Sequence, residues 1–345
     1  MDLKEIYQAV NKRINEVDFS LLWHGFKPLK FAVYNDEDCF FNGGYIDKTD
    51  QFLANTAIKY NGEFIAIWYL GDETIDYDIL ATKIIHEMFH GFQFSHHESR
   101  FPNELEALRD YRYNLNNLSL KMEENKLING LIDRFNHDAF EKLLKLRKYR
   151  QSQYRYEYLY EASIEQIEGS ALYVELEALK QLSRTKFKAA ITANMENIVQ
   201  PKNLIPMRIV SYSIGALLLY VIKKHTDIEV DQFGDETFAE TMLKHTLYEE
   251  IQPKVNKAVE ETLDAYHHET RAMIDATLKM NNCVLEGKFP LVGVNVYNAR
   301  RLDAYLISTY FVAYKKADKD EIKQGDYLIE MDEDGDIKKL YAMKM

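Results

Sequence analysis

The chain has 345 residues, which is enough for about two domains and a sizeable buried core. Hydrophobic residues make up 46% and charged residues 28%, a composition that excludes a mostly disordered chain. The 43 Lys and Arg residues stand against 55 Asp and Glu residues, so the net charge is −12 and we expect no nucleic-acid partner.

The chain begins with a predicted helix, because apolar residues recur at spacings of three and four over residues 3–17. Residues 31–70 then form short β-prone runs with turn signals at 42–44 and 61–62. This pattern predicts an antiparallel sheet of three or four strands. The last strand, residues 64–70, is expected to border the functional cleft and to offer its edge to an extended peptide.

Helical periodicity continues almost without a break from about residue 75 to 281, and only 14 Gly and 6 Pro residues occur in the whole chain. β-prone runs return after residue 281. We therefore predict an α+β fold with a main domain at 1–281 and a small C-terminal β-rich module at 282–345.

No segment is typical of a secreted or membrane protein. The two cysteines, Cys39 and Cys283, are too few for a disulfide framework, and the N-terminal residues lack the pattern of a signal peptide. The longest apolar stretch, residues 209–222, is shorter than the ~20 residues that a membrane-spanning helix needs. We expect a cytoplasmic protein with no membrane partner.

The most informative motif is His86-Glu87-Met88-Phe89-His90, which lies within a periodic apolar segment. Residues four apart lie about 40° from each other around a helix, so both imidazoles can bind one metal ion. Glu87 lies off that face but near the metal, where its carboxylate can act as a general base. A helix that begins near Asp76 or Asp78, directly after a β-strand, would give the layout of zinc metallopeptidases called zincins.

A catalytic zinc takes three protein ligands, so a third ligand is needed. His96 has the spacing of the third metzincin histidine, but position 93 is Gln where that pattern has Gly. Glu168 and Glu165 are the other candidates, in a helical segment where Glu168 is followed by small residues that permit close helix packing. These glutamates also recur with Glu161 and Glu175 at spacings that fit an exposed acidic face.

Two further motifs resemble the gluzincins, the zinc peptidases related to aminopeptidase N and thermolysin. Residues 168–171, Glu-Gly-Ser-Ala, are similar to the Glu-Gly-x-Ala element of that family, and the resemblance implies that Glu168 is the third zinc ligand. Tyr212-Ser213-Ile214-Gly215 resembles the Tyr-x-x-Gly element, which implies that the Tyr212 hydroxyl stabilises the oxyanion. The long spacer between His90 and Glu168 implies a helical insertion at about residues 100–160. The Gly-x-Met-Glu-Asn element that binds a substrate amine in those aminopeptidases is absent before residue 86.

The segment at residues 147–160 alternates basic and aromatic side chains. We expect its rings to pack inward and its arginines to extend into solvent.

Together these features predict a zincin-like catalytic domain that binds Zn²⁺ and hydrolyses peptide bonds in a peptide or protein substrate, with Glu87 as general base. Two alternatives remain open. One is a zinc hydrolase of a non-peptide amide or ester, and the other is a non-catalytic binding or scaffold protein that keeps the zinc site.

Overall fold

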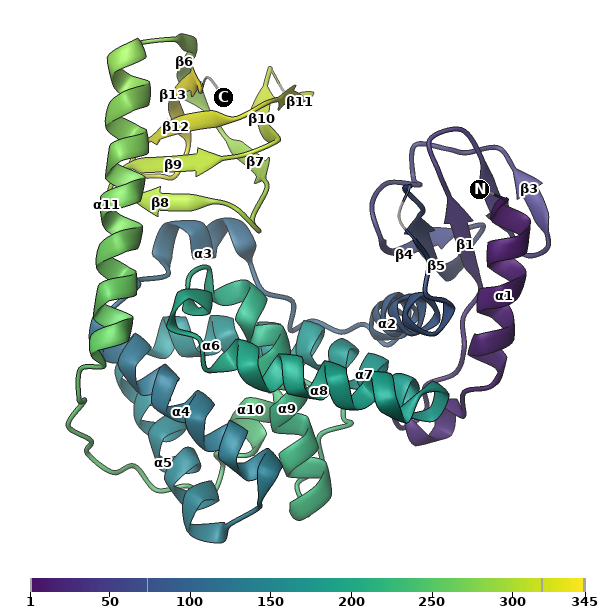
Figure 1. Cartoon of the computed structure of the whole chain (residues 1–345). Coiled ribbons are helices and arrows are strands. Elements are labelled where there is room, and N and C mark those ends of the chain that lie inside the picture. The colour runs from purple at the N-terminus through teal and green to yellow at the C-terminus, as the bar shows by residue number, and fades with distance from the viewer. Residues whose placement is uncertain (1, 73, 318, 344–345) are drawn as a thin grey trace.

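The computed structural model describes residues 2–72, 74–317 and 319–343 and shows an α+β protein (Figure 1). The N-terminal part consists of α1 (Leu3–Asn15), η1 (Phe19–Leu21), β1 (Phe31–Tyr34), β2 (Cys39–Phe41), β3 (Gly44–Ile46), β4 (Thr56–Tyr60) and β5 (Glu63–Tyr69). The Asp2 side chain caps α1 by accepting a hydrogen bond from the Lys4 backbone N–H. The apolar stripe that predicted this helix is buried.

The N-terminal sheet is mixed rather than antiparallel, with the strand order β3-β2-β1-β5-β4. The predicted turns join β2 to β3 and β4 to β5 as antiparallel hairpins. β1 and β5, however, pair in parallel, with Phe31 opposite Ala66 and Tyr34 opposite Tyr69. The prediction of an antiparallel sheet is therefore wrong at this pair, because turn residues specify only hairpin neighbours and this pairing joins distant segments.

β5 is an interior strand, so the predicted peptide-binding edge at residues 64–70 is wrong. β1 and β4 flank β5, and β4 lies at the edge of the sheet. Ile65, Ala66 and Ile67 in the middle of β5 are fully buried, and α2 packs against this strand. A strand with both faces covered is most stable inside a sheet, where both of its hydrogen-bonding edges are also paired.

The middle of the chain is helical, with α2 (Tyr77–Ser95), α3 (Glu104–Asp110), α4 (Leu115–Asp133), α5 (His137–Gln153), α6 (Arg155–Ile164), η2 (Glu165–Gly169), α7 (Ser170–Leu182), α8 (Arg184–Ile198), η3 (Pro201–Leu204), α9 (Met207–His225), α10 (Phe238–Thr241) and α11 (Lys257–Met280). The helices are interrupted more than the periodicity predicted, notably at 226–237 and 242–256. These two stretches contain Gly234 and Pro253, which disfavour helix. Across the described residues, every helix is too short or too polar to cross a bilayer.

The predicted C-terminal β module begins at Cys283, directly after α11. It contains β6 (Cys283–Phe289), β7 (Leu291–Val294), β8 (Arg300–Leu302), β9 (Tyr305–Ser308), β10 (Phe311–Lys316), β11 (Lys319–Gln324), β12 (Tyr327–Met331) and β13 (Ile337–Ala342). The strands form two sheets, β11-β10-β7 and β6-β13-β12-β9-β8. Ile274 of α11 is buried against the second sheet, and Leu105 and Leu108 of α3 pack on the module's core.

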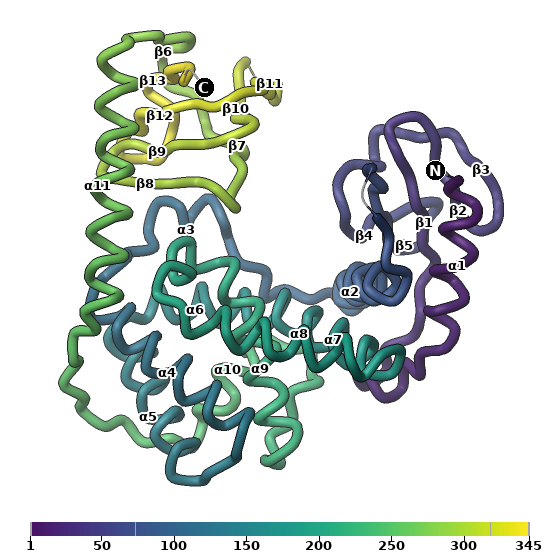
Figure 2. Tube along the Cα trace, in the orientation of Figure 1, coloured from purple at the N-terminus to yellow at the C-terminus, as the bar shows by residue number. Residues whose placement is uncertain are grey.

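The N-terminal sheet and the C-terminal module lie apart, on either side of the helical lobe (Figure 2). α2 follows β5 and packs extensively on α7, so this helix joins the N-terminal sheet to the lobe. The candidate metal-binding residues lie at that junction.

Candidate metal centre

α2 carries the two histidines of the motif. The helix begins after Asp76, whose side chain accepts hydrogen bonds from the backbone N–H groups of Asp78 and Ile79 at 3.0 and 3.2 Å. Of the two predicted caps, Asp76 is therefore the one used. The rings of His86 and His90 lie on one face of α2 with their centroids 4.9 Å apart.

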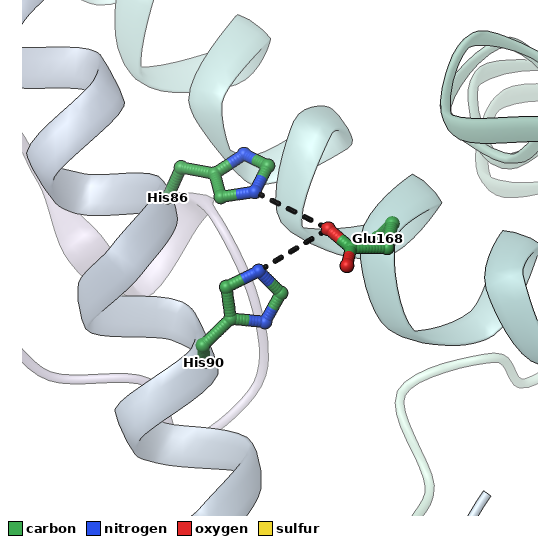
Figure 3. A group of neighbouring side chains, drawn as sticks. All are labelled: His86, His90 and Glu168. Carbon is green, nitrogen blue, oxygen red and sulfur yellow. Dashed lines mark ion pairs between the residues drawn. The ribbon is translucent and has the colours of Figure 1, made fainter. Parts of the chain in front are cut away.

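Glu168 faces these two rings from the far side of the site (Figure 3). Its Oε2 atom lies 3.8 Å from Nε2 of His86 and 3.4 Å from Nε2 of His90. One ligand atom from each residue lies within 4.8 Å of the others. Metal bonds of about 2.0–2.1 Å in a tetrahedral site separate ligand atoms by about 3.3 Å, and the two distances from Glu168 Oε2 to the imidazoles are close to this value.

The Nδ1 atom of each imidazole lies within hydrogen-bonding distance of an acceptor. His86 Nδ1 lies 3.0 Å from a carboxylate oxygen of Glu175, and His90 Nδ1 lies 2.8 Å from the amide oxygen of Gln93. Both acceptors favour the tautomer with the proton on Nδ1, which leaves the Nε2 lone pair of each ring directed at Glu168. This is the usual arrangement behind histidines that bind metals.

Gln93 also joins helix α2 to the segment that bears Glu168. Its amide nitrogen donates to the backbone carbonyl of Ile167 at 3.1 Å and to the Ser170 hydroxyl at 3.2 Å. Position 93, which lacks the glycine of metzincins, thus bears a side chain that holds His90 and the Glu168 segment together.

The other two candidate ligands lie elsewhere. Glu165 is fully buried and pairs with Lys121 at 3.0 Å and Arg147 at 2.6 Å. The His96 ring stacks on Phe233, and its Nδ1 atom lies 2.9 Å from the carbonyl oxygen of Phe92. Among the described residues, the structure thus brings together the HExxH histidines and Glu168.

Glu168 lies in a single turn of π-helix, η2, between α6 and α7. A Cβ atom on Gly169 would come within 2.7 Å of Cα of Gly215, and one on Gly215 within 2.7 Å of the Glu165 carbonyl oxygen. Both positions therefore require glycine for η2 and α9 to approach this closely. Single π-helical turns are frequent at functional sites, and here the glycine pair also brings Tyr212 beside Glu168.

Tyr212 reaches the site through Arg208. The Nη2 atom of Arg208 donates to Glu168 Oε1 and to the Tyr212 hydroxyl, both at 2.9 Å. Burial, and then the charge of Glu168, raise the pKa of Tyr212, so its hydroxyl stays protonated. Because a guanidinium can only donate, the Tyr212 oxygen accepts from Arg208, and the hydroxyl proton of Tyr212 can be donated to Tyr297 or to another acceptor.

Glu87 is half-buried on α2 beside His86. Within residues 2–72, 74–317 and 319–343, no side chain or backbone group forms a hydrogen bond or ion pair with its carboxylate. Burial opposes a charge on His86, but Glu168, Glu175 and Glu87 together raise the pKa of His86 well above its usual value, so a metal ion at Nε2 would displace a proton from that atom. A half-buried carboxylate next to His86 in the sequence, without a protein partner among the described residues, is able to exchange protons.

Comparison with known proteins gives no match. No family model matches the sequence, and no curated protein or solved structure is significantly similar to it. The chemistry of the site therefore has to be inferred from its own residues.

Three side chains have a place in the site that the sequence did not predict: Arg208, Glu175 and Gln93. Glu175 lies seven residues after Glu168, which places both on one face of a helix, and Arg208 lies four residues before Tyr212. The sequence shows both spacings. It does not show that these side chains lie beside the histidines, because that depends on how α2, α7 and α9 pack.

We expect replacement of Glu175 by Ala to weaken zinc binding about 10- to 100-fold, because His86 loses the acceptor that orients its ring. Competition with a zinc-chelating dye measures the affinity. Glu177→Ala is the matched control, since Glu177 lies on the same helix but pairs with Lys180. Equal affinities in the two variants would contradict this role of Glu175.

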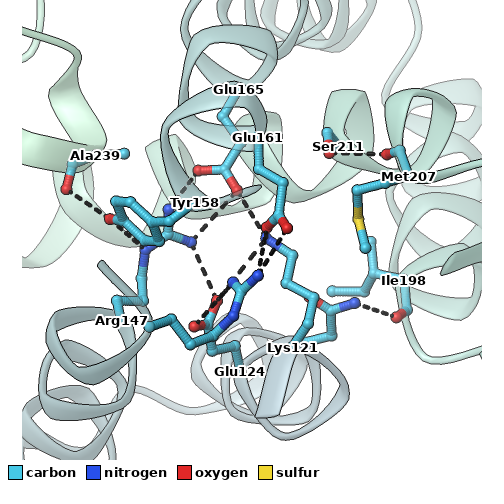
Figure 4. A network of polar contacts seen from close by, with 12 residues as sticks. Lys121, Glu124, Arg147, Tyr158, Glu161, Glu165, Ile198, Met207, Ser211 and Ala239 are labelled. Carbon is cyan, nitrogen blue, oxygen red and sulfur yellow. Dashed lines mark hydrogen bonds and ion pairs between the residues drawn. The ribbon is translucent and has the colours of Figure 1, made fainter. Parts of the chain in front are cut away.

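Behind the π-helix lies a buried network of charges (Figure 4). Three cations and three carboxylates make it up, and all are at most 1% exposed: Lys121, Arg147, Arg150, Glu124, Glu161 and Glu165. The prediction that the arginines of 147–160 extend into solvent is wrong for Arg147 and Arg150, whereas Arg155 is exposed as expected. The alternative of an exposed acidic face is wrong as well, because Glu161 and Glu165 are buried. The opposite charges compensate each other pairwise, which is what permits their burial.

Breaking this network is expected to destabilise the protein. Arg147→Met removes a cation that pairs with Glu165 at 2.6 Å, and we expect the free energy of unfolding to fall by about 3–5 kcal/mol. Urea denaturation measures the change. Lys142→Met, which removes an exposed pair with Glu123, should change the midpoint little. Similar midpoints for both variants would contradict the importance of the network.

Proposed function

We propose that this protein is a zinc-dependent metallopeptidase of the gluzincin type, with His86, His90 and Glu168 as the zinc ligands. The convergence of these three side chains from two separate helices is the observation that carries the proposal. Two imidazoles and one carboxylate are typical of catalytic zinc, which keeps one position open, whereas structural zinc has four protein ligands. The resemblance of residues 168–171 and 212–215 to gluzincin elements supports the same conclusion.

When bound, Zn²⁺ activates water as a nucleophile at neutral pH and polarises the carbonyl under attack. Glu87 accepts a proton from the nucleophile at a carboxylate oxygen and delivers it to the nitrogen of the leaving amine. Tyr212 donates its hydroxyl proton to the oxygen on which negative charge develops. Arg208 holds Tyr212 and the second oxygen of Glu168 in place, which leaves Glu168 Oε2 directed at the histidines.

The unpaired carboxylate of Glu87 favours catalysis over a zinc-bearing scaffold, because a structural zinc needs no base beside it. A peptide substrate is supported by β4, which lies at the edge of the N-terminal sheet and also contacts the metal-bearing helix α2. An extended peptide can pair with such an edge through backbone hydrogen bonds, which need no particular sequence.

Metal removal tests this function. We expect the zinc-loaded protein to hydrolyse members of a quenched fluorescent peptide library, a chelator to abolish the activity, and Zn²⁺ but not Mg²⁺ to restore it. Ester and non-peptide amide substrates are assayed in parallel. Hydrolysis that persists without metal would contradict the proposal, and a fully loaded protein inactive on every peptide would favour the scaffold or the non-peptide hydrolase.

A further inference from the structure

A pocket of about 330 Å³ lies where the helical lobe meets the C-terminal module. Glu104 and Arg208 form part of its wall, and Arg208 also contacts Glu168, so the pocket adjoins the candidate metal centre. Tyr160 and Tyr266 contribute aromatic walls. A pocket of this size, next to the site and partly apolar, can hold one or two residues of a bound peptide.

Two guanidinium groups in this pocket have no carboxylate partner. Arg112 precedes α4 and Arg301 lies on β8, and neither forms an ion pair with any residue that the structure describes. Arg301 is fixed by donating to the backbone carbonyls of Leu108 at 3.0 Å and Asp303 at 3.2 Å. Both arginines line the same pocket, and burial, followed by the charge of Arg112, lowers the pKa of Arg301.

The acidic side chains around the pocket are already paired with other arginines. Glu104 binds Arg208, Asp110 binds Arg109, and Asp303 binds Arg271. Asp110 partly offsets the charges of Arg112 and Arg301 but forms its ion pair with Arg109. Both guanidinium groups can therefore still bind a ligand, although the protein as a whole carries a net charge of −12.

We propose that this pocket binds a carboxylate of the substrate, either an acidic side chain or the free C-terminus of a peptide. The inference rests on the proposed function as a metallopeptidase and specifies its substrate class. It also gives the C-terminal module a role, because Arg301 comes from that module and Arg112 from the helical lobe. Two arginines suit a carboxylate, since Arg112 can donate two parallel hydrogen bonds to it and Arg301 can donate from Nη2, which has no acceptor among the described residues.

The test measures peptide binding, so that it does not depend on cleavage. Four versions of one fluorescent peptide, with Glu or Gln at a central position and a free or amidated C-terminus, are titrated by anisotropy. The protein is the Glu87→Gln variant, both zinc-loaded and metal-free, because a carboxylate can also bind zinc directly. We expect the peptide with Gln and an amidated C-terminus to bind about tenfold more weakly than an acidic version.

Arg301→Met and Arg112→Met should each remove most of this preference in both metal states, whereas Arg184→Met, an exposed arginine on α8, should leave it intact. Arg112 is exposed, so its variant remains informative if Arg301→Met proves unstable. If affinity falls when Glu is replaced by Gln, the pocket binds the side-chain carboxylate. If it falls on amidation, the pocket binds the C-terminal carboxylate. Equal binding of all four peptides, absence of binding, or a preference that survives both substitutions would overturn the inference.

The two proposals fail separately. A preference for carboxylates in a protein that hydrolyses no peptide would refute the peptidase and leave the pocket assignment standing. Hydrolysis of acidic and neutral peptides with equal efficiency, together with equal binding, would refute the pocket alone.

Discussion

Replacing Glu87 by Gln is expected to lower kcat for peptide hydrolysis by about 10²- to 10⁴-fold while zinc remains bound. The amide of glutamine has nearly the same shape as the carboxylate but cannot accept a proton. Glu87 contacts neither histidine through a hydrogen bond, so its loss leaves the ligand set unchanged. Steady-state kinetics on a cleaved peptide and metal analysis of the same sample measure the two quantities.

Glu63→Gln serves as the control for Glu87→Gln. Glu63 lies at the start of β5, where it forms an exposed ion pair with Lys30, and its substitution should leave both kcat and zinc content unchanged. Full activity of the Glu87→Gln variant would contradict the assignment of the base. Loss of zinc together with activity would show that Glu87 belongs to the ligand set instead.

Replacing Glu168 by Gln is expected to weaken zinc binding by at least about 100-fold. The substitution removes the negative charge that faces both imidazoles. Loss of a hydrogen-bond partner of a metal ligand typically lowers metal affinity about 10- to 100-fold, and loss of a ligand itself should lower it more. Arg208 keeps its ion pair with Glu104, so we expect the local fold to survive. Dye competition measures the affinity, and circular dichroism checks the helices.

Glu165→Gln and His96→Ala separate the three candidate third ligands. Glu165→Gln should keep zinc but lower the stability, because it leaves Lys121 and Arg147 without one of their buried partners. His96→Ala should keep zinc as well, since its ring packs on Phe233. Retention of zinc by Glu168→Gln with loss in either other variant would show that the third ligand has been misassigned.

The site was predictable where local spacing determines which side chains meet. His86 and His90 share a helix face because they are four residues apart, and Gly169 and Gly215 allow the close approach that places Glu168 and Tyr212 together. The hairpin turns of the N-terminal sheet were predictable for the same reason, since they join neighbours in the sequence.

The rest depends on contacts between distant segments. Nothing in the local pattern of β1 or β5 specifies that they pair in parallel, because both read as short buried strands. The local sequence around Arg147 and Arg150 is typical of surface residues. They are buried because carboxylates from α4, α6 and η2 surround them. The same holds for Arg301, which lines one pocket with Arg112 because the C-terminal module packs on α3.

The most direct test of the zinc site is a crystal structure of the zinc-loaded protein with anomalous diffraction collected on both sides of the zinc absorption edge. We expect a single strong zinc peak about 2.0–2.2 Å from Nε2 of His86, Nε2 of His90 and a carboxylate oxygen of Glu168. A zinc peak at other residues, or crystals soaked in zinc that show none between these three side chains, would contradict the account.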